Sequence, residues 1–402
     1  MAAAMPLENA PRQASELPQQ SEIVKFHAPE VVFGLGSLME VGFAAVRLGA
    51  RRPFVVTDEG ILRTGWVTEM LTHLSSAGLK PTVWSDLTPN PKDEEVTAGY
   101  ASYVESGCDV IIAIGGGSAM DAAKGIAILS GNGGSILDYT GVDQVTRAIP
   151  PLLMIPTTSG TGADVSQFCI VTDTKRLVKV TIMGRALVPD ISITDPRLLT
   201  TMPEGLNAAT GLDALTHGVE AYVSLASNPL ADAHALSAVR LVGAHLAGTM
   251  TKPDDLDGRK KMAQASLEAG LAFSNAILGA THAMSHQVGG LLDAPHGVVN
   301  GVLLSHVIRF NARSTPERYR AIAVAVGLPA AAAPADEVAD MLADYVRSLG
   351  DEVGVPRGLR ELGVSDSDIP KLAESTLLDA CLATNPRTAD VHDIERIFRA
   401  AL

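Results

Sequence analysis

The chain has 402 residues, enough for two domains of roughly 100–200 residues each. Apolar residues make up 47% and charged residues 19%, so the chain can bury a large core and disorder is not expected. The formal net charge of −14 gives no electrostatic footprint for nucleic acid or for an anionic membrane. No stretch approaches about 18 uninterrupted apolar residues, which argues against a membrane span.

The amino-terminal residues 1–21 are rich in Ala, Pro, Gln and Glu and contain no long apolar core. This composition predicts a flexible extension rather than a signal peptide. The three cysteines, Cys108, Cys169 and Cys381, form no C-x-x-C pair, and their number is odd. We expect free thiols in a reducing compartment, which is typical of a cytoplasmic protein.

Residues 22–200 alternate short apolar runs with helical patterns. Strands are predicted at 53–57, 81–84, 109–114, 151–155, 168–172, 178–183 and 191–194, and helices at 64–77, 93–106 and 118–129. Alternation of this kind predicts an α/β domain with a parallel sheet and helices on both of its faces.

The strand signals vanish after about Asp195. Helical patterns then fill 204–225, 230–247, 258–275 and most of the remainder. Pro, Thr and charged residues interrupt the pattern near 196–203, which is typical of a domain boundary. The sequence therefore predicts an α/β nucleotide-binding domain over 22–200 and an all-α domain over 201–402.

The predicted strand at 109–114 runs directly into the turn Gly115-Gly116-Gly117-Ser118. Glycines permit positive φ and close approach of the backbone to a ligand, and the free N–H groups at a helix start attract phosphate. Ser118 is predicted to be the N-cap of the next helix, with Asp121 at the N3 position. A tight capped turn without a ligand has the same pattern, and the Rossmann fingerprint G-x-G-x-x-G is absent.

The predicted strand at 151–155 leads into a second polar turn, Pro156-Thr157-Thr158-Ser159-Gly160-Thr161-Gly162. Ligands of doubly wound sheets bind at the carboxyl ends of the strands, so two such turns together favour a dinucleotide site. Asp58 ends the first predicted strand of the chain, the one at 53–57. Its carboxylate is predicted to accept hydrogen bonds from an adenosine ribose, although a solvated turn residue is an equally simple interpretation.

Four of the ten histidines fall in segments typical of a metal site. Asp213 and His217 are four residues apart, as are His282 and His286, so each pair shares one face of a helix. His296 follows after the breaker Ala294-Pro295. Oxygen together with imidazole suits iron or zinc. Spacing alone leaves open which of these histidines bind the metal.

Five motifs, taken in order and with their mutual spacing, resemble the iron-containing, or group III, alcohol dehydrogenases over residues 22–402. They are Asn90-Pro91, GGGSAMDAAK from Gly115, PTTSGTG from Pro156, GLDALTH from Gly211, and HAMSHQVGGLLDAPHG from His282. The resemblance implies a dehydroquinate synthase-like fold, with the cofactor and metal sites in the cleft between the two domains. One departure is Ala163-Asp164, where many members carry Ser-Glu, so the hydrogen bonds behind this turn are expected to differ.

The resemblance also implies the roles of individual residues. It makes Asp213, His217, His282 and His296 the ligands of Fe²⁺, or of Zn²⁺ in its place, and leaves His286 as the unligated histidine beside the nicotinamide and substrate. An imidazole there suits a catalytic proton relay, because it titrates near the working pH. The residues implied to bind NAD, together with Asp121 from the glycine turn, are Asp58, Asn90, Gly116, Gly117, Ser118, Thr157, Thr158, Thr161 and Lys179. Those implied to line the substrate pocket are Phe273, Phe168 and Cys381.

The implied function is hydride transfer between NAD(H) and a small alcohol or aldehyde, with the metal as Lewis acid. Two alternatives remain open from the sequence. One is a hydroxyacid–oxoacid transhydrogenase that retains its cofactor, and the other is a metal- and NAD-dependent lyase of the dehydroquinate synthase type. The resemblance further implies a homodimer or higher homo-oligomer, with neither nucleic acid nor membrane as a partner.

Overall fold

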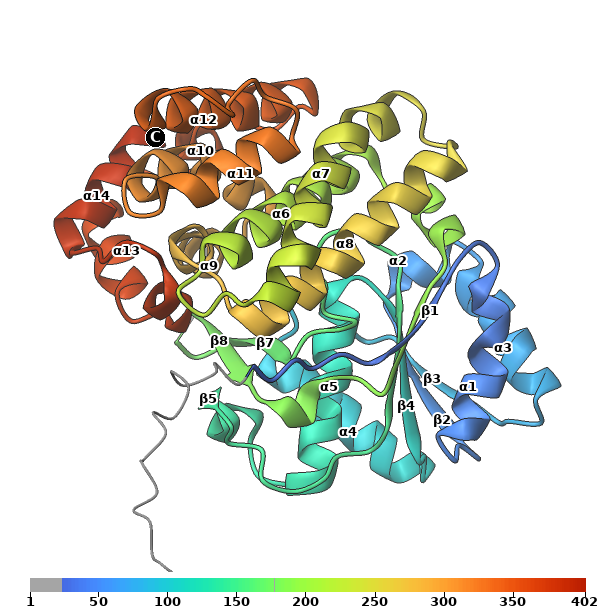
Figure 1. Cartoon of the computed structure of the whole chain (residues 1–402). Coiled ribbons are helices and arrows are strands. Elements are labelled where there is room, and N and C mark those ends of the chain that lie inside the picture. Colours follow the sequence, from blue (N-terminus) through green and yellow to red (C-terminus); the bar gives the residue numbers. More distant parts are fainter. Residues whose placement is uncertain (1–23, 177) are drawn as a thin grey trace, which may run out of the picture.

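The computed structural model describes residues 24–176 and 178–402, so the extension expected over 1–21 lies outside the described residues. Two halves follow one another along the chain. Figure 1 shows a sheet-containing half, coloured blue to green, beside a purely helical half, coloured yellow-green to red. The last strand of the first half ends at Thr194, and the first long helix of the second half begins at Glu204.

The main sheet has six strands, all paired in parallel. In spatial order they are β1 (Glu30–Phe33), β9 (Ile191–Thr194), β6 (Leu152–Pro156), β4 (Val110–Gly115), β2 (Pro53–Val56) and β3 (Thr82–Trp84). The chain adds β3 on one side of β2 and β4 on the other. Doubly wound sheets bind ligands at such a reversal, outside the carboxyl ends of the strands.

Helices cover both faces of this sheet because successive side chains of a strand point to opposite faces. In β4, Ile111 and Ala113 pack in one apolar cluster, while Ile112 and Ile114 pack in another. The first cluster includes side chains of α4 (Asp93–Ser106) and α5 (Gly117–Asn132), and the second includes side chains of α1 (Val41–Arg47) and α3 (Trp66–Ser76). The short helix α2 (Glu59–Leu62) follows β2.

Two predicted strands leave the main sheet. β7 (Phe168–Asp173) and β8 (Val178–Met183) pair with each other in antiparallel register, and β8 also pairs with β5 (Gly141–Val142). A parallel pair needs a crossover of about a dozen residues, whereas the short connection between β7 and β8 closes only as a hairpin. The prediction did not anticipate this second sheet, nor the edge strand β1.

The helical half contains nine α-helices within the described residues, packed around one large apolar core. They are α6 (Glu204–Val223), α7 (Pro229–Thr251), α8 (Leu256–Ala276), α9 (Ala280–Leu292), α10 (His296–Asn311), α11 (Pro316–Ala325), α12 (Ala335–Glu352), α13 (Ile369–Thr376) and α14 (Val391–Ala400). Among the described residues, no helix combines the length and apolar character needed to cross a membrane.

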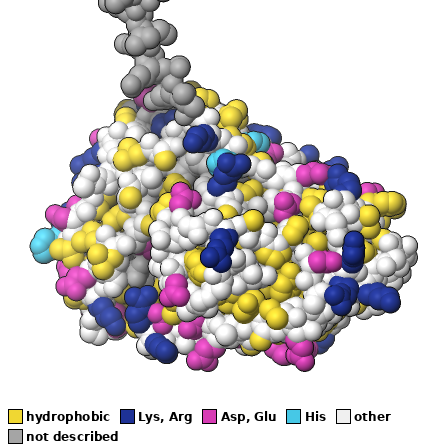
Figure 2. All heavy atoms as spheres, turned by 90° about the horizontal axis from the view of Figure 1, so that it is seen from below, with side chains coloured by type: hydrophobic (Ala, Val, Ile, Leu, Met, Phe, Trp, Pro, Cys, Tyr) yellow, Lys and Arg dark blue, Asp and Glu magenta, His cyan; other side chains and the backbone are white. Residues whose placement is uncertain are grey.

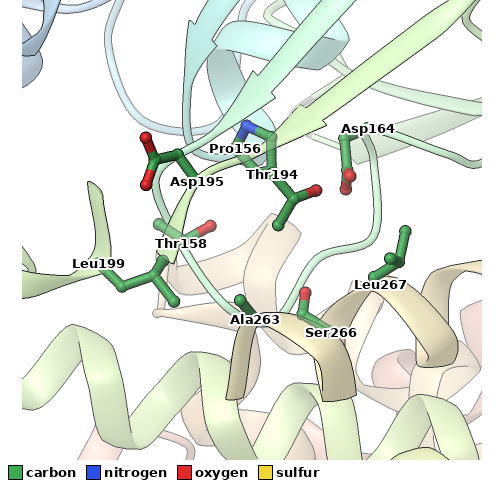
Figure 3. A pocket seen from close by; sticks show the side chains of 9 residues that line it. All are labelled: Pro156, Thr158, Asp164, Thr194, Asp195, Leu199, Ala263, Ser266 and Leu267. Carbon is green, nitrogen blue, oxygen red and sulfur yellow. The ribbon is translucent and has the colours of Figure 1, made fainter. Parts of the chain in front are cut away.

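A small cavity marks the seam between the two halves. It has a volume of about 10 Å³, roughly the space of one water molecule. Figure 3 shows Thr194 and Asp195, at the end of β9, facing Ala263 and Ser266 of α8 across it. The hydroxyl of Thr194 is buried without a hydrogen-bond partner. This cavity is too small for an organic ligand, so it is distinct from the candidate site.

Candidate metal and cofactor site

The long helix α6 presents an aspartate and a histidine on one buried face. Asp213 and His217 are one helical turn apart, and their exposed fractions are only 3% and 4%. His217 Nδ1 lies 3.1 Å from the carbonyl oxygen of Gly160, in the polar turn after β6. Because a carbonyl oxygen only accepts, Nδ1 carries the proton and the lone pair of His217 is on Nε2.

Two further helices bring histidines to the same carboxylate. Asp213 Oδ1 is 3.6 Å from Nε2 of His282 on α9, and 3.9 Å from Nε2 of His296 at the start of α10. It is also 3.9 Å from Nε2 of His217. The four residues that the family resemblance implied as ligands are therefore brought together by three helices.

Burial and mutual contact determine the charges of this cluster. Burial opposes ionisation of Asp213, but the adjacent imidazoles, His217 first among them, hold the pKa of its carboxyl well below its usual range. Burial lowers the pKa of His217 to about 4 and lowers that of His296 as well. Burial opposes protonation of His282, but its contacts with Asp213 and Glu220 raise its pKa to about 9, so a divalent metal would bind in place of the proton on its Nε2. The cluster thus offers one carboxylate and three imidazoles, the donor set that first-row divalent metals prefer.

The dimensions of the cluster also fit a divalent ion. Tetrahedral ligands at about 2.1 Å from a metal are roughly 3.4 Å from one another, close to the separations seen here. Asn300, one turn after His296, places its Nδ2 at 2.8 Å from Asp213 Oδ1, 3.1 Å from His282 Nε2 and 3.2 Å from His296 Nε2. These three atoms therefore face one region, and the side-chain NH₂ group of Asn300 lies in it.

His286 shares a face of α9 with His282 but is placed elsewhere. Its Nδ1 lies 2.9 Å from Oδ2 of Asp379, a residue just before the short 3₁₀ helix Ala380–Thr384. The His286 ring stacks on that of His296 with 5.3 Å between centroids. His286 is thus beside the cluster, held by its own carboxylate.

The glycine turn after β4 faces the threonine turn after β6. A Cβ atom on Gly116 would lie 3.3 Å from Cγ2 of Thr158, and one on Gly117 would lie 3.0 Å from Cγ2 of Thr161. The backbone N–H of Thr157 donates to the carbonyl of Gly115 at 2.9 Å. A Cβ atom at either position would therefore crowd the facing threonine, so glycine suits this close approach of the two turns.

The prediction that Ser118 caps α5 is wrong. The helix begins at Gly117 with Gly116 as its N-cap, and no side chain caps it. Because β4 extends to Gly115, the chain enters the helix directly through glycines. Ser118 Oγ instead accepts the backbone N–H of Asn90 at 3.1 Å. Asp121 consequently lies in the second turn, where burial raises the pKa of its carboxyl to about 7.

Asn90 connects the two halves of the molecule. Its backbone has a φ of 57°, in the left-handed region that asparagine tolerates better than most residues. Lys179 Nζ donates to Asn90 Oδ1 at 2.8 Å, and Asn90 Nδ2 donates to Asp293 Oδ1, at the end of α9, at 2.5 Å. Two residues implied to bind the cofactor therefore meet each other at the end of the helix that carries the candidate metal ligand His282.

The remaining implied residues also have defined places. Asp58 is the N-cap of α2, with its Oδ1 accepting the N–H of Ile61 at 3.1 Å, and it is only partly buried. The three implied pocket residues, Phe168, Phe273 and Cys381, belong to one apolar cluster. Phe273 stacks on the ring of His217 at 4.3 Å between centroids, so this cluster adjoins the candidate metal ligands.

Comparison with known proteins identifies the family. The profile described as "Iron-containing alcohol dehydrogenase" matches residues 28–196, and that described as "Fe-containing alcohol dehydrogenase family, C-terminal" matches 207–402. The chain belongs to the iron-containing alcohol dehydrogenase family. The expected family, fold and enzyme class, with iron and NAD as the family's cofactors, are thereby confirmed.

Relatives agree with this assignment over nearly their whole length. The 1,3-propanediol dehydrogenase of Citrobacter freundii is 41% identical over 92% of this chain and 96% of its own. The NAD-dependent methanol dehydrogenase of Bacillus methanolicus is 36% identical over 94% and 99%. The crystal structure of a 1,3-propanediol oxidoreductase superposes with a TM-score of 0.92 at 39% identity, covering 94% of this chain and all of that one.

Three polar residues of this alcohol dehydrogenase site were missed by sequence reasoning. Glu220 contacts His282, Asn300 contacts three candidate ligands, and Asp379 contacts His286. Spacing offered a signal for the first two, because Glu220 follows His217 by three residues and Asn300 follows His296 by four. Asp379 is 93 residues from its partner, so no local pattern indicates it.

The departure at Ala163-Asp164 is accommodated in this member of the family. Asp164 is buried, and its Oδ2 accepts the hydroxyl of Ser192 on β9 at 2.7 Å. Burial raises the pKa of its carboxyl. The carboxyl group also borders the small cavity between the domains in Figure 3. The turn therefore has a polar partner behind it, through a hydrogen bond to the sheet.

Proposed function

We propose that this protein interconverts small alcohols and aldehydes with NAD(H), using a divalent iron held by Asp213, His217, His282 and His296. The observation that supports the ligand set is the convergence of one carboxylate and three imidazoles, each Nε2 lying within 3.9 Å of Asp213 Oδ1. Zn²⁺ would fit the same donors.

The chain's own residues divide the work of such a site. A divalent metal bound there supplies a Lewis acid for the alcohol or carbonyl oxygen. The carboxylate of Asp213 offsets part of the metal's charge, and buried helices hold the imidazoles with little freedom to reorganise. His217 is further held by Gly160, which ties the metal site to the threonine turn of the nucleotide-binding domain.

His286 is proposed as the proton relay. Oxidation of an alcohol releases the hydroxyl proton, and reduction of an aldehyde takes one up. With Nδ1 directed at Asp379, Nε2 is the atom of His286 that is left to exchange this proton. An imidazole suits the role because its ordinary pKa is near neutral pH.

The facing glycine and threonine turns are proposed to hold the cofactor. Bound NAD supplies the hydride acceptor. The backbone of Gly116, Gly117 and Ser118 at the start of α5 suits the pyrophosphate. Thr157 keeps a buried hydroxyl without a partner. The residues proposed to complete the site are Asp58, Asn90, Asp121, Thr158, Thr161 and Lys179.

The proposed substrate is a small, uncharged alcohol or its aldehyde. Phe168, Phe273 and Cys381 are proposed to line its pocket; all three belong to one apolar cluster, in which Phe273 stacks on His217. The relatives named for 1,3-propanediol and methanol agree with a short carbon chain. An apolar lining would disfavour a charged substrate, because no group would offset the cost of burying its charge.

The test is a panel of short alcohols, diols and aldehydes, measured through NADH absorbance after the enzyme is loaded anaerobically with Fe²⁺. We expect turnover with at least one short-chain pair and loss of turnover after chelation. An enzyme that turned over none of them, or that kept full activity without metal, would contradict the proposal.

We further propose that the protein forms homodimers or larger homo-oligomers in the cytoplasm. Four exposed apolar side chains line one stretch of β1–α1: Leu35, Met39, Phe43 and Val46, with Phe43 73% exposed. This stretch lies near β1, an edge strand of the main sheet, and a second copy would cover both.

The three cysteines are free, in keeping with a reducing compartment. Figure 2 shows acidic, basic and hydrophobic side chains interspersed over the face seen from below.

A further inference from the structure

Glu220 extends the face of α6 that carries Asp213 and His217. These residues are at positions i, i+4 and i+7, so their side chains leave the helix on the same side. Glu220 has an exposed fraction of 2%, although it carries a carboxylate. A buried carboxylate is costly unless its oxygens are fully engaged in hydrogen bonds.

Those hydrogen bonds come from the start of α9. Oε1 accepts the N–H of Thr281 at 2.6 Å, and Oε2 accepts those of Gly279 at 3.1 Å and His282 at 3.4 Å. The N-cap residue Gly279 has no side chain to perform this task. A helix start attracts negative charge, so Glu220 acts as a cap supplied by another helix.

The same carboxylate also holds the side chain of His282. Oε2 of Glu220 lies 2.7 Å from His282 Nδ1, which is shorter than the 3.1 Å contact of His282 Nε2 with Asn300. A carboxylate accepts, so Nδ1 of His282 carries a proton that it donates to Glu220, and Nε2 is the atom left to bind a metal. This is the atom that lies 3.6 Å from Asp213 Oδ1.

We propose that Glu220 is a positioning residue for the metal: it fixes the tautomer and orientation of His282 and strengthens it as a ligand. This inference rests on the proposed ligand set. It adds a link between metal binding and the packing of α6 against α9, since one carboxylate holds both the start of α9 and its metal-binding ring. Histidine ligands that donate to such a carboxylate typically lose 10–100-fold in metal affinity, as an order of magnitude, when it is removed.

The test compares Glu220→Gln with Glu204→Gln, a matched change at an exposed glutamate in the first turn of the same helix. Zn²⁺ is the probe, and its dissociation constant is measured by competition with a chelator. The glutamine keeps an oxygen for the backbone N–H groups but removes the charge from His282. We expect affinity to fall by roughly 10–100-fold in Glu220→Gln and to be unchanged in the control. Wild-type affinity in a folded Glu220→Gln protein would overturn the proposal.

A spectroscopic measurement separates tuning of the ligand from simple support of the fold. In zinc-loaded protein labelled with ¹⁵N-histidine, the Nδ1–H proton of His282 should resonate at low field and move upfield in Glu220→Gln. An unmoved resonance would count against the proposal. If Glu220→Gln does not fold, Glu220→Asp takes its place, because it keeps the charge but withdraws it by one methylene. It should bind Zn²⁺ at least about tenfold more weakly, and wild-type affinity would refute the assignment.

A His296→Ala protein distinguishes this inference from the ligand set on which it rests. If that variant keeps its zinc, the ligand set is wrong. If it loses zinc while Glu220→Gln binds as tightly as the wild type, the ligand set stands and only the role of Glu220 fails.

Discussion

His286 donates from Nδ1 to Oδ2 of Asp379 at 2.9 Å, and this contact separates it from the metal cluster although it shares a helix face with His282. Burial opposes ionisation of Asp379, but the contact with His286 holds the pKa of its carboxyl below its ordinary value. The carboxylate is therefore an acceptor, and His286 keeps its proton on Nδ1.

The His286→Ala variant should retain its metal and lose turnover. A relay in general acid–base catalysis contributes roughly 10²–10⁴-fold, so kcat should fall by that factor while metal content stays at the wild-type level. The pH profile of kcat should also lose one ionisation. Loss of metal together with activity would instead make His286 a ligand.

The His296→Ala variant should lose its metal. Removal of a direct ligand should weaken binding by at least about 100-fold, the upper range for a partner that acts through a ligand. Elemental analysis after gel filtration measures the remaining occupancy. His286→Ala is the natural control, since the two rings stack on each other and only one is expected to bind. Full occupancy in His296→Ala would refute the ligand set.

Asp58 should set the preference for NAD(H) over NADP(H). Asp58→Asn removes the charge but keeps an oxygen for the N–H of Ile61, because asparagine caps helices as well as aspartate does. We expect the ratio of kcat/KM values for the two cofactors to narrow by roughly tenfold or more. Glu59→Gln, at the exposed neighbouring residue, should leave it unchanged. A wild-type enzyme that already prefers NADPH would contradict this role.

His306 should make the fold less stable in acid. Burial, with Arg347 and Arg309 nearby, lowers the pKa of His306 to about 4. Between that value and the unfolded pKa of about 6.5, the unfolded chain binds a proton that the folded protein does not. The contribution of His306 to the free energy of unfolding is therefore fully present above about pH 6.5, and it falls by up to about 1.4 kcal/mol per pH unit as pH drops toward 4.

The His306→Gln variant removes this titration and keeps an acceptor for Arg347, which contacts Nε2 of His306 at 2.9 Å. Urea denaturation of metal-free wild type and variant at several pH values gives the comparison. The unfolding free energy of the wild type should fall relative to that of the variant as pH drops from 6.5 toward 4. A difference that does not depend on pH would show that His306 titrates normally.

Phe43→Glu should dissociate the proposed dimer. Burial of a phenylalanine stabilises the dimer by about 1.5–3 kcal/mol. A symmetric interface buries this residue of both copies, so the contribution is made twice. Sedimentation should show a monomer, whereas Val104→Glu, at an apolar side chain of α4 that is 57% exposed, should leave the mass unchanged. An unaltered mass in Phe43→Glu would place the interface elsewhere.

The sequence by itself determined the features that depend on near neighbours. Alternating apolar runs indicated five of the six strands of the main sheet, and glycine and threonine turns indicated the edge where a cofactor would bind. Spacing of four residues placed Asp213 with His217 and His282 with His286 on common faces. These are properties of at most two helical turns, so short stretches of sequence carry them.

Only the tertiary structure decided how those pieces meet. The start of α10 carries His296 to Asp213, 3.9 Å away, while Asp379 holds His286, and no periodicity distinguishes the two histidines. Glu220 reaches the start of α9 across 62 residues of sequence, and β7 and β8 form their own sheet. Such contacts depend on how whole helices and strands pack against one another, and a local pattern carries no record of a distant partner.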